Sequence, residues 1–157
     1  MRVQDLMTRE VATVLPADEL GRAARLMEKR DCGCVAVLDD ASKVAGALTD
    51  RDVCMAAMRT DSPLSRLNVG AAMSAPVCAC RPDDSIAEAE RQMGLHQVRR
   101  LLVVDADGRL AGILSLDDIA REACREEDLI AAPVSAEAVG ITLGQIGRPH
   151  LIEDVEA

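Results

Sequence analysis

The hydrophobic pattern of residues 1–60 predicts five elements in the order strand, helix, strand, strand, helix. An extended apolar segment covers 10–16, and a helical segment follows in which apolar residues recur at intervals of three and four. Two short apolar runs then flank a polar turn within 34–48, which is typical of a hairpin. A second helical pattern covers 50–58.

The same order is written again in the second half of the chain. A shift of 66 residues aligns the sequence with itself without a gap, and 16 of the 60 pairs from Met1/Leu67 to Thr60/Glu126 are identical. The second strand pair, within 101–114, carries an Asp107-Gly108 turn signal. Units of about 60 residues bury little apolar surface alone, so we expect the two copies to pack on each other about a pseudo-twofold axis.

One short motif begins the last helix of each copy. Thr49 is followed three residues later by Asp52, and Ser115 by Asp118, which is typical of a capping box. A helix start also presents free amides to a phosphate, and an aspartate there accepts hydrogen bonds from a ribose diol. Gly46 would let the backbone approach such a ligand closely. A single copy of the motif would be interpreted as a structural helix cap. Because the motif recurs at the same place in both copies, we also interpret it as a ligand-binding site.

These segments resemble a known repeat. "VQDLMTREVATVLPADEL", "GALTDRDV" and "GILSLDDI" are similar to the CBS (cystathionine β-synthase type) domain, and "VRRLLVVDADGRLAGILSLDDI" is especially similar to the γ subunit of AMP-activated protein kinase. The resemblance implies an α/β (α+β) fold of two tandem β-α-β-β-α CBS repeats, a Bateman module. It divides the chain into a first repeat at 1–60, a linker at 61–68, a second repeat at 69–126 and a tail at 127–157.

The resemblance also implies two clefts between the repeats that bind adenosine nucleotides. The ligand would be AMP, ADP, ATP or S-adenosylmethionine, and Mg2+ would accompany a phosphorylated one. Asp52 and Asp118 would hold ribose hydroxyls, while Thr49 and Ser115 would meet phosphate. Six further residues would border the adenine pockets, namely Thr13, Val14 and Val35 in one cleft and Cys78, Cys80 and Leu101 in the other.

The copies differ in charge beside this motif. Asp50 and Arg51 stand in the first copy, where Arg51 offers a guanidinium to a phosphate, whereas Asp117 in the second copy would repel a polyphosphate. Arg99 and Arg100 stand at the start of the middle strand of the second copy, where the kinase subunit has a basic pair. We expect Arg51, Arg99 and Arg100 to gather at the shared cleft. The alternative is that they are solvated or pair with acids such as Asp31 and Asp117.

Composition narrows the choice of ligand. The chain contains no Phe, Tyr or Trp, and its net charge is −9. Without aromatic side chains it cannot stack a nucleic-acid base on a ring, and its charge opposes a phosphate backbone, so we expect no nucleic-acid partner. The core must be aliphatic, and an adenine would lie between aliphatic side chains.

We expect a cytoplasmic protein without a membrane segment. The N-terminus lacks an apolar signal region, and no stretch approaches the 18 apolar residues of a membrane helix. Six cysteines in such a chain indicate reduced thiols. The spacing of Cys32 with Cys34 and of Cys78 with Cys80 leaves open a metal or redox role, against the simpler role of small buried hydrophobes.

The sequence therefore predicts a regulatory module that binds an adenosine nucleotide and is not an enzyme. No nucleophile and base recur together, and the two histidines have no evident partners. By resemblance we expect a homodimer of four repeats that acts on an unidentified regulated protein. Two alternatives remain, a ligand-independent interaction scaffold and a cysteine-based metal or redox sensor. The tail matches neither repeat and would include a short helix. The tail as a whole would cap a dimer or reach an unknown partner.

Overall fold

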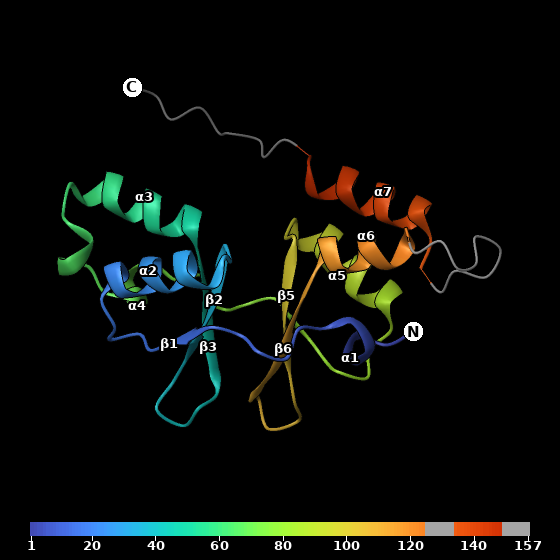
Figure 1. The fold of residues 1–157 in the computed structure, drawn as a ribbon, viewed down its shortest axis with the longest axis horizontal. Coiled ribbons are helices and arrows are strands. Elements are labelled where there is room, and N and C mark those ends of the chain that lie inside the picture. Colours follow the sequence, from blue (N-terminus) through green and yellow to red (C-terminus); the bar gives the residue numbers. More distant parts are fainter. Residues whose placement is uncertain (125–133, 149–157) are drawn as a thin grey trace.

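The computed structural model describes residues 1–124 and 134–148, and its elements repeat in the predicted order (Figure 1). The first repeat contains α1 (Val3–Leu6), β1 (Thr13–Val14), α2 (Leu20–Arg30), β2 (Cys34–Leu38), β3 (Val44–Thr49) and α3 (Asp50–Thr60). After the 3-10 turn η1 (Leu64–Arg66), the second repeat contains α4 (Val69–Ala72), β4 (Ala79–Cys80), α5 (Ile86–His96), β5 (Arg100–Val104), β6 (Leu110–Ser115) and α6 (Leu116–Ala123), and α7 (Ala136–Ile146) follows. The predicted fold of two β-α-β-β-α repeats is confirmed, and each repeat adds a short opening helix, α1 or α4, that the hydrophobic pattern did not predict.

Each repeat forms a three-stranded sheet with the same register. β1 runs parallel to β2, which runs antiparallel to β3, and β4, β5 and β6 repeat the arrangement. The hairpin turns are equivalent as well, because the carboxylates of Asp39 and Asp105 each accept two backbone N–H groups of their own turn. Gly108 has a φ of 80°, which glycine adopts at little cost, and Ser42 at the same position has a φ of 59°. The hairpin predicted from Asp107-Gly108 is therefore present.

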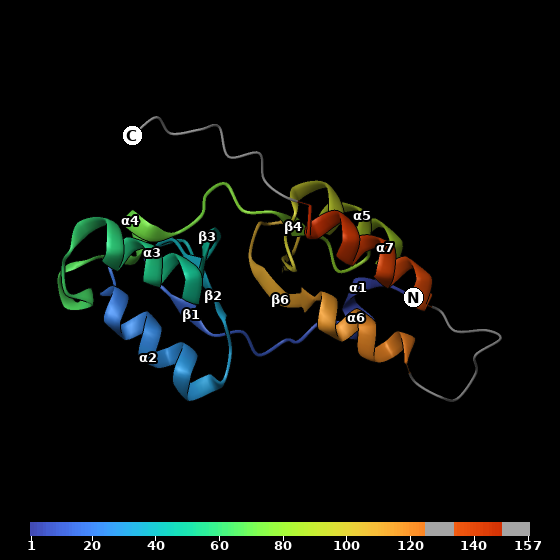
Figure 2. The same cartoon turned by 90° about the horizontal axis from the view of Figure 1, so that it is seen from above.

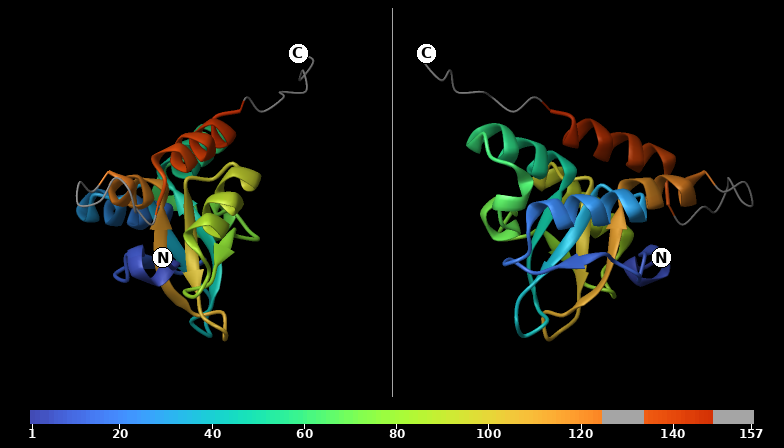
Figure 3. Two further views of the ribbon diagram at one scale, coloured as in Figure 1. Left: turned by 90° about the vertical axis from the view of Figure 1, so that its right-hand side faces the viewer. Right: turned by 60° about the vertical axis from the view of Figure 1, so that its left-hand side comes forward.

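The short opening helices are exchanged between the repeats. Val3 of α1 is fully buried in the core of the second repeat, and Val69 of α4 in the core of the first. The segments that follow them pair with the hairpin of the same neighbour. Thr8 and Ile113 exchange two backbone hydrogen bonds of 2.9 Å, and Ser74 pairs with Ala47 in the same way. The exchange ties the two repeats together, and Figure 3 shows the dark blue helix α1 beside the orange strand β6 of the second repeat.

The exchange accounts for the glycine that recurs in both motifs. A Cβ on Gly112 would lie 2.8 Å from the carbonyl oxygen of Thr8, and a Cβ on Gly46 would lie 2.9 Å from that of Ser74. Both distances are shorter than a side-chain carbon tolerates. The close approach that we expected for a phosphate at Gly46 is therefore made by the crossing backbone of the other repeat.

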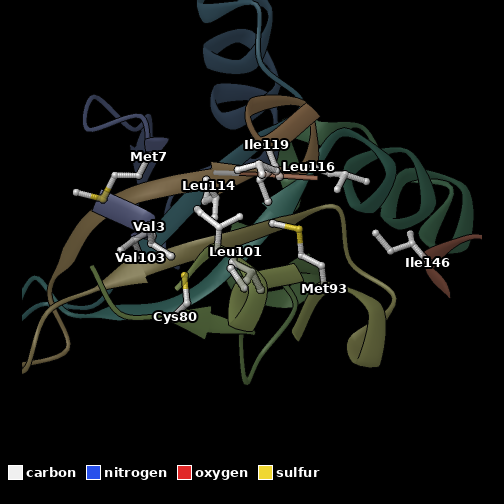
Figure 4. Packing of buried hydrophobic residues seen from close by; sticks show 13 residues of the cluster. Val3, Met7, Cys80, Met93, Leu101, Val103, Leu114, Leu116, Ile119 and Ile146 are labelled. Carbon is white, nitrogen blue, oxygen red and sulfur yellow. The ribbon is translucent and has the colours of Figure 1, made fainter. Parts of the chain in front are cut away.

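Each repeat encloses its own aliphatic core. Figure 4 shows the core of the second repeat, in which Val3 and Met7 from the exchanged segment meet Leu101 and Leu114 from the sheet. Ile146 of α7 joins the same core, and α7 packs along α5 and α6 (Figure 2). This part of the tail is thus a component of the second repeat. Within the described ranges, no helix is both long enough and apolar enough to cross a membrane.

Candidate functional site

The two repeated motifs form capping boxes with nearly identical geometry. The Asp52 carboxylate accepts the Thr49 backbone N–H at 2.8 Å and the Thr49 hydroxyl at 2.7 Å, and the Asp52 N–H donates to that hydroxyl at 3.2 Å. Ser115 and Asp118 make the same three bonds at 2.9, 2.6 and 3.1 Å. Each box ends a half-buried strand and begins a helix, so the backbone amides of that helix start are held in a fixed direction.

One of these helix starts opens into a cavity of about 320 Å3 to which both repeats contribute, and we call it the inter-repeat cleft. The second repeat supplies Arg100, Ile113, Ser115 and Asp118, and the first repeat supplies Thr8, Glu10, Val11, Ala12, Arg30, Asp31, Cys32, Gly33 and Cys34. The volume lies at the lower end of the range for small-molecule sites. The exchanged segment 8–12 forms one wall, so the cleft exists only because the opening helices cross over.

Strand register places a cation beside the helix start. Arg100 lies opposite Ser115 across the pairing of β5 with β6, and it begins its strand on the exposed side. Its guanidinium reaches toward the first repeat, because Nη2 lies 3.8 Å from the position that a Cβ on Gly33 would occupy. Arg100 therefore places a positive charge next to the start of α6. The Leu116 N–H there already donates to the Arg99 carbonyl and the Asp118 N–H to the Ser115 hydroxyl, so an anion would meet the guanidinium and the positive end of the helix dipole.

The cleft also contains carboxylates, and these limit where an anion fits. Glu10 and Asp31 stand on the wall of the first repeat, and Asp118 stands below Ser115. The Arg121 guanidinium, on the exposed face of α6, donates to the other carboxylate oxygen of Asp118 and forms an ion pair with it. In the first repeat the residue equivalent to Arg121 is Met55, and Asp52 forms no ion pair within the described residues. The two aspartates thus differ in how much hydrogen-bonding capacity remains for a ligand.

The structure separates the three arginines that we expected together. Arg100 lines the inter-repeat cleft, whereas Arg51 and Asp52 line a different cavity of about 460 Å3 between α3 and α4, where Arg59 joins them. Arg99 is exposed and is not among the residues that line the cleft. The alternative, in which these arginines pair with Asp31 or Asp117, is not observed within the described residues either.

Most of the residues predicted to border adenine lie in the cores. Four of them, Val14, Val35, Cys80 and Leu101, are between 0% and 4% exposed and pack in the apolar clusters. Cys78 packs against the apolar core of the second repeat, and Thr13 is exposed. Asp50 lines a groove between α2 and α3, while Asp117, like Thr13, is exposed outside the inter-repeat cleft. The apolar wall of the cleft comes instead from Val11, Ala12 and Ile113, which the sequence did not single out because they meet only through the exchange.

The cysteine pairs show no sign of a metal centre in the part of the chain that the structure describes. No group of three or more His, Cys, Asp or Glu side chains there could hold a metal ion. Burial raises the pKa of the Cys34 thiol to about 11, although nearby Arg100 lowers it, and burial raises that of Cys80 to about 12. Both thiols are therefore protonated at neutral pH, which suits small buried hydrophobes better than ligands or nucleophiles.

Comparison with known proteins gives an independent view of the chain. The family model for the CBS domain matches residues 3–59 and 69–125. The CBS domain-containing protein YhcV of Bacillus subtilis is 37% identical over 120 residues, which cover 75% of this chain and 82% of that protein. Two crystal structures are also similar. Hypoxic Response Protein I with two coordinated zinc ions is 30% identical with a TM-score of 0.70 over 77% of this chain and 98% of that one. CBSX2 in complex with AMP is 27% identical with a TM-score of 0.68 over 78% and 95%.

Proposed function

Since the chain belongs to the CBS domain family, we propose that it is a regulatory module that binds an adenosine nucleotide in the inter-repeat cleft. The main support for the proposal is the position of Arg100, which lies beside the helix start at Ser115 in a cavity that both repeats line. The structure of the similar protein CBSX2 with AMP supports the ligand class. S-adenosylmethionine is the second ligand to test.

Each part of the ligand has a counterpart in the cleft. Arg100 and the positive end of the α6 helix dipole would bind the phosphate, and Asp118 would accept a hydrogen bond from the ribose. Val11, Ala12 and Ile113 would contact the adenine, which the aliphatic composition allows. A polyphosphate would bring Mg2+ on its own oxygens. We extend the proposal to a second, pseudo-equivalent site at Thr49 and Asp52, where no arginine of the described residues pairs with the carboxylate.

Regulation would follow from the position of the cleft. A ligand that contacts the exchanged segment, the first repeat and the second repeat at once binds best at one relative orientation of the repeats. It therefore shifts the population toward that orientation by as much as its affinity differs between the two. The proposal includes self-association as a homodimer and an action on a separate protein, both of which are expected of the family.

Thermal-shift measurements test the proposal. AMP, ADP, ATP, NADH and S-adenosylmethionine are each added to the whole chain at millimolar concentration. A ligand at about 100 times its Kd stabilises the fold by about 2.7 kcal/mol, which corresponds to a Tm increase of roughly 5–10 °C. If none of these ligands raises the Tm and zinc does, the nucleotide proposal is wrong and the metal-sensor alternative is favoured.

A pair of neighbouring variants tests the role of Arg100. Arg100→Gln is expected to weaken AMP binding by about tenfold or more and adenosine binding little, because a charged hydrogen bond to phosphate is lost. Arg99→Gln, which removes the same charge one residue away from the cleft, is the matched control. Equal losses for AMP and adenosine, measured by isothermal titration calorimetry, would remove the phosphate role from Arg100.

A further inference from the structure

A second cavity lies between α3 and α4, and we call it the α3/α4 cavity. Its volume of about 460 Å3 is within the range of small-molecule sites. One wall is α3, and the other is the segment 67–74, which contains α4 (Figure 2). No described residue lines both this cavity and the inter-repeat cleft. The α3/α4 cavity is therefore separate from that cleft, and it meets the capping box of α3 only through Asp52.

Two arginines line the cavity from one stripe of α3. Arg51 and Arg59 are eight residues apart with Met55 midway between them, so all three lie on the same side of the helix. Neither arginine forms an ion pair with any residue that the structure describes. In each observed ion pair an arginine meets an acid three or four residues before it in the chain, and Arg59 has Met55 and Ala56 at those places. The two guanidinium charges are thus available to a ligand.

Each end of the cavity combines one arginine with an uncharged side chain that can form hydrogen bonds. Ser74 lies at the Arg51 end, because it exchanges two backbone hydrogen bonds with Ala47, close to the start of α3. Asn68 stands six residues before Ser74, just ahead of α4, which places it toward the Arg59 end. Its side chain caps no helix among the described residues, so its amide is available to a ligand as well.

The middle of the cavity is apolar. Met55, Ala56 and Ala72 are half-buried there, and the two alanines also pack against the core of the first repeat. Asp52 is the one acid among the described residues that line the cavity, and one of its carboxylate oxygens already accepts the backbone N–H and the hydroxyl of Thr49. With two arginines and one aspartate, the lining carries a net positive charge in a chain whose net charge is −9.

The equivalent groove of the second repeat has the opposite charge. It lies between α1 and α6 and has a volume of about 470 Å3. It is lined by Asp5, Leu6, Asp118, Arg121 and Glu122. Arg121 pairs with Asp118, and the two remaining acids stand where the first repeat has Ala71 and Ala56. The positive charge of the α3/α4 cavity is therefore a property of the first copy and not of the repeated fold.

We propose that the α3/α4 cavity binds a small organic dianion whose two charged groups are joined by an apolar chain, such as an α,ω-dicarboxylate. The Cα atoms of Arg51 and Arg59 are about 12 Å apart along the helix axis, because each residue of an α-helix adds about 1.5 Å. One carboxylate binds Arg51 and Ser74. The other binds Arg59 and Asn68, and the apolar chain packs on Met55. The site does not depend on which ligand the inter-repeat cleft binds.

Dicarboxylates of different length supply the probes. Decanedioate carries a carboxylate at each end of a long alkyl chain. Decanoate has the same chain with one carboxylate, and butanedioate has both carboxylates on a short chain. In isothermal titration calorimetry with the whole chain, decanedioate is expected to bind at least about tenfold more tightly than either control, because it alone pairs with both arginines at once. Equal binding of decanedioate and decanoate would show that the second arginine contributes nothing, and the proposal would be wrong.

Matched variants of the chain test the two arginines. Arg51→Gln combined with Arg59→Gln is expected to weaken decanedioate binding at least about tenfold, since two exposed ion pairs with the ligand are lost. Arg25→Gln combined with Lys29→Gln removes two positive charges from exposed positions of α2 and is expected to bind decanedioate as the unchanged chain does. Equal affinities of these two double variants would overturn the proposal.

The second repeat supplies a further variant. Met55→Arg combined with Ala56→Glu gives α3 the residues that α6 has at the equivalent positions, and both fit a helix of this fold. This variant is expected to keep the Tm of the unchanged chain within a few degrees and to bind decanedioate at least about tenfold more weakly, because the apolar middle is replaced by charges. Unchanged affinity would contradict the assignment of the ligand to this cavity.

Competition with AMP separates this proposal from the nucleotide proposal. AMP is expected to leave the affinity for decanedioate unchanged, because the inter-repeat cleft and the α3/α4 cavity share no described lining residue. Competitive displacement of decanedioate by AMP would overturn the proposal, since the cavity would then belong to the nucleotide site at Thr49 and Asp52. The thermal response of the Arg51→Gln and Arg59→Gln double variant to AMP, measured alongside, reports on the nucleotide proposal by itself.

Discussion

Gly112→Ala tests the exchange on which the inter-repeat cleft depends. Gly112 lies in β6, and a Cβ there would be 2.8 Å from the Thr8 carbonyl oxygen and 2.9 Å from Met7 Sδ. Its φ lies outside the left-handed region, so alanine meets no backbone strain at this position. The perturbation is therefore one of space alone, and the crossing segment has to move.

The size of the effect follows from what the crossing segment would lose. Met7 has a flexible side chain that can turn away, but the Thr8 carbonyl belongs to the backbone and moves only if the segment shifts. The shift strains two hydrogen bonds of 2.9 Å between Thr8 and Ile113, each contributing about 0.5–1.5 kcal/mol. Overpacking adds a cost of about 1–3 kcal/mol to the strain in these hydrogen bonds. We therefore expect the free energy of unfolding to fall by about 2–4 kcal/mol and the Tm to fall by roughly 5–15 °C.

Urea unfolding followed by circular dichroism measures the loss, and Gly140→Ala is the control. Gly140 lies within α7 with nothing near the position of a Cβ, so alanine there should raise the free energy of unfolding by about 0.5–1 kcal/mol through helix propensity. Gly46→Ala should behave as Gly112→Ala does, because its Cβ would meet the Ser74 carbonyl oxygen. A change within about 0.5 kcal/mol of the unchanged chain for Gly112→Ala would refute the crossing geometry.

Two further substitutions give distinct outcomes. Burial raises the pKa of Glu90, which is 7% exposed and has a side-chain oxygen without a hydrogen-bond partner among the residues that the structure describes. The folded state therefore holds its proton to higher pH than the unfolded chain does. The free-energy cost of burying the charged Glu90 carboxylate is absent below the unfolded pKa of 4.5 and grows as pH rises through the folded pKa. Glu90→Gln should therefore stabilise the chain at about pH 8 and have little effect at about pH 4, and thermal unfolding measured across this pH range would show the difference. Arg121→Met introduces the residue that the first repeat has at the equivalent position. It should tighten nucleotide binding, because Asp118 loses its ion-pair partner, and it should change the free energy of unfolding by at most about 0.5 kcal/mol, because the pair is on the surface. Calorimetric titration with AMP measures the first effect, and urea unfolding measures the second.

The repeated elements were predictable because their signals are local. The helical spacing of apolar residues, the turn at Gly108 and the cap at Thr49 each depend on a few neighbouring residues. The exchange of α1 and α4 was not predictable in this way, since each helix has only four residues and its buried valine contacts the other repeat. A periodicity within one segment carries no information about which core that segment joins.

The same distinction explains the outcome for the candidate site. Ser115 and Asp118 were placed at a helix start by their spacing, and Arg100 was found at the start of its strand. Val35 and Leu101 were assigned to adenine, yet both lie in middle strands that are buried through most of their length, so neither side chain has a free face. The residues that do form the apolar wall, such as Val11 and Ile113, come from segments about a hundred residues apart in the sequence.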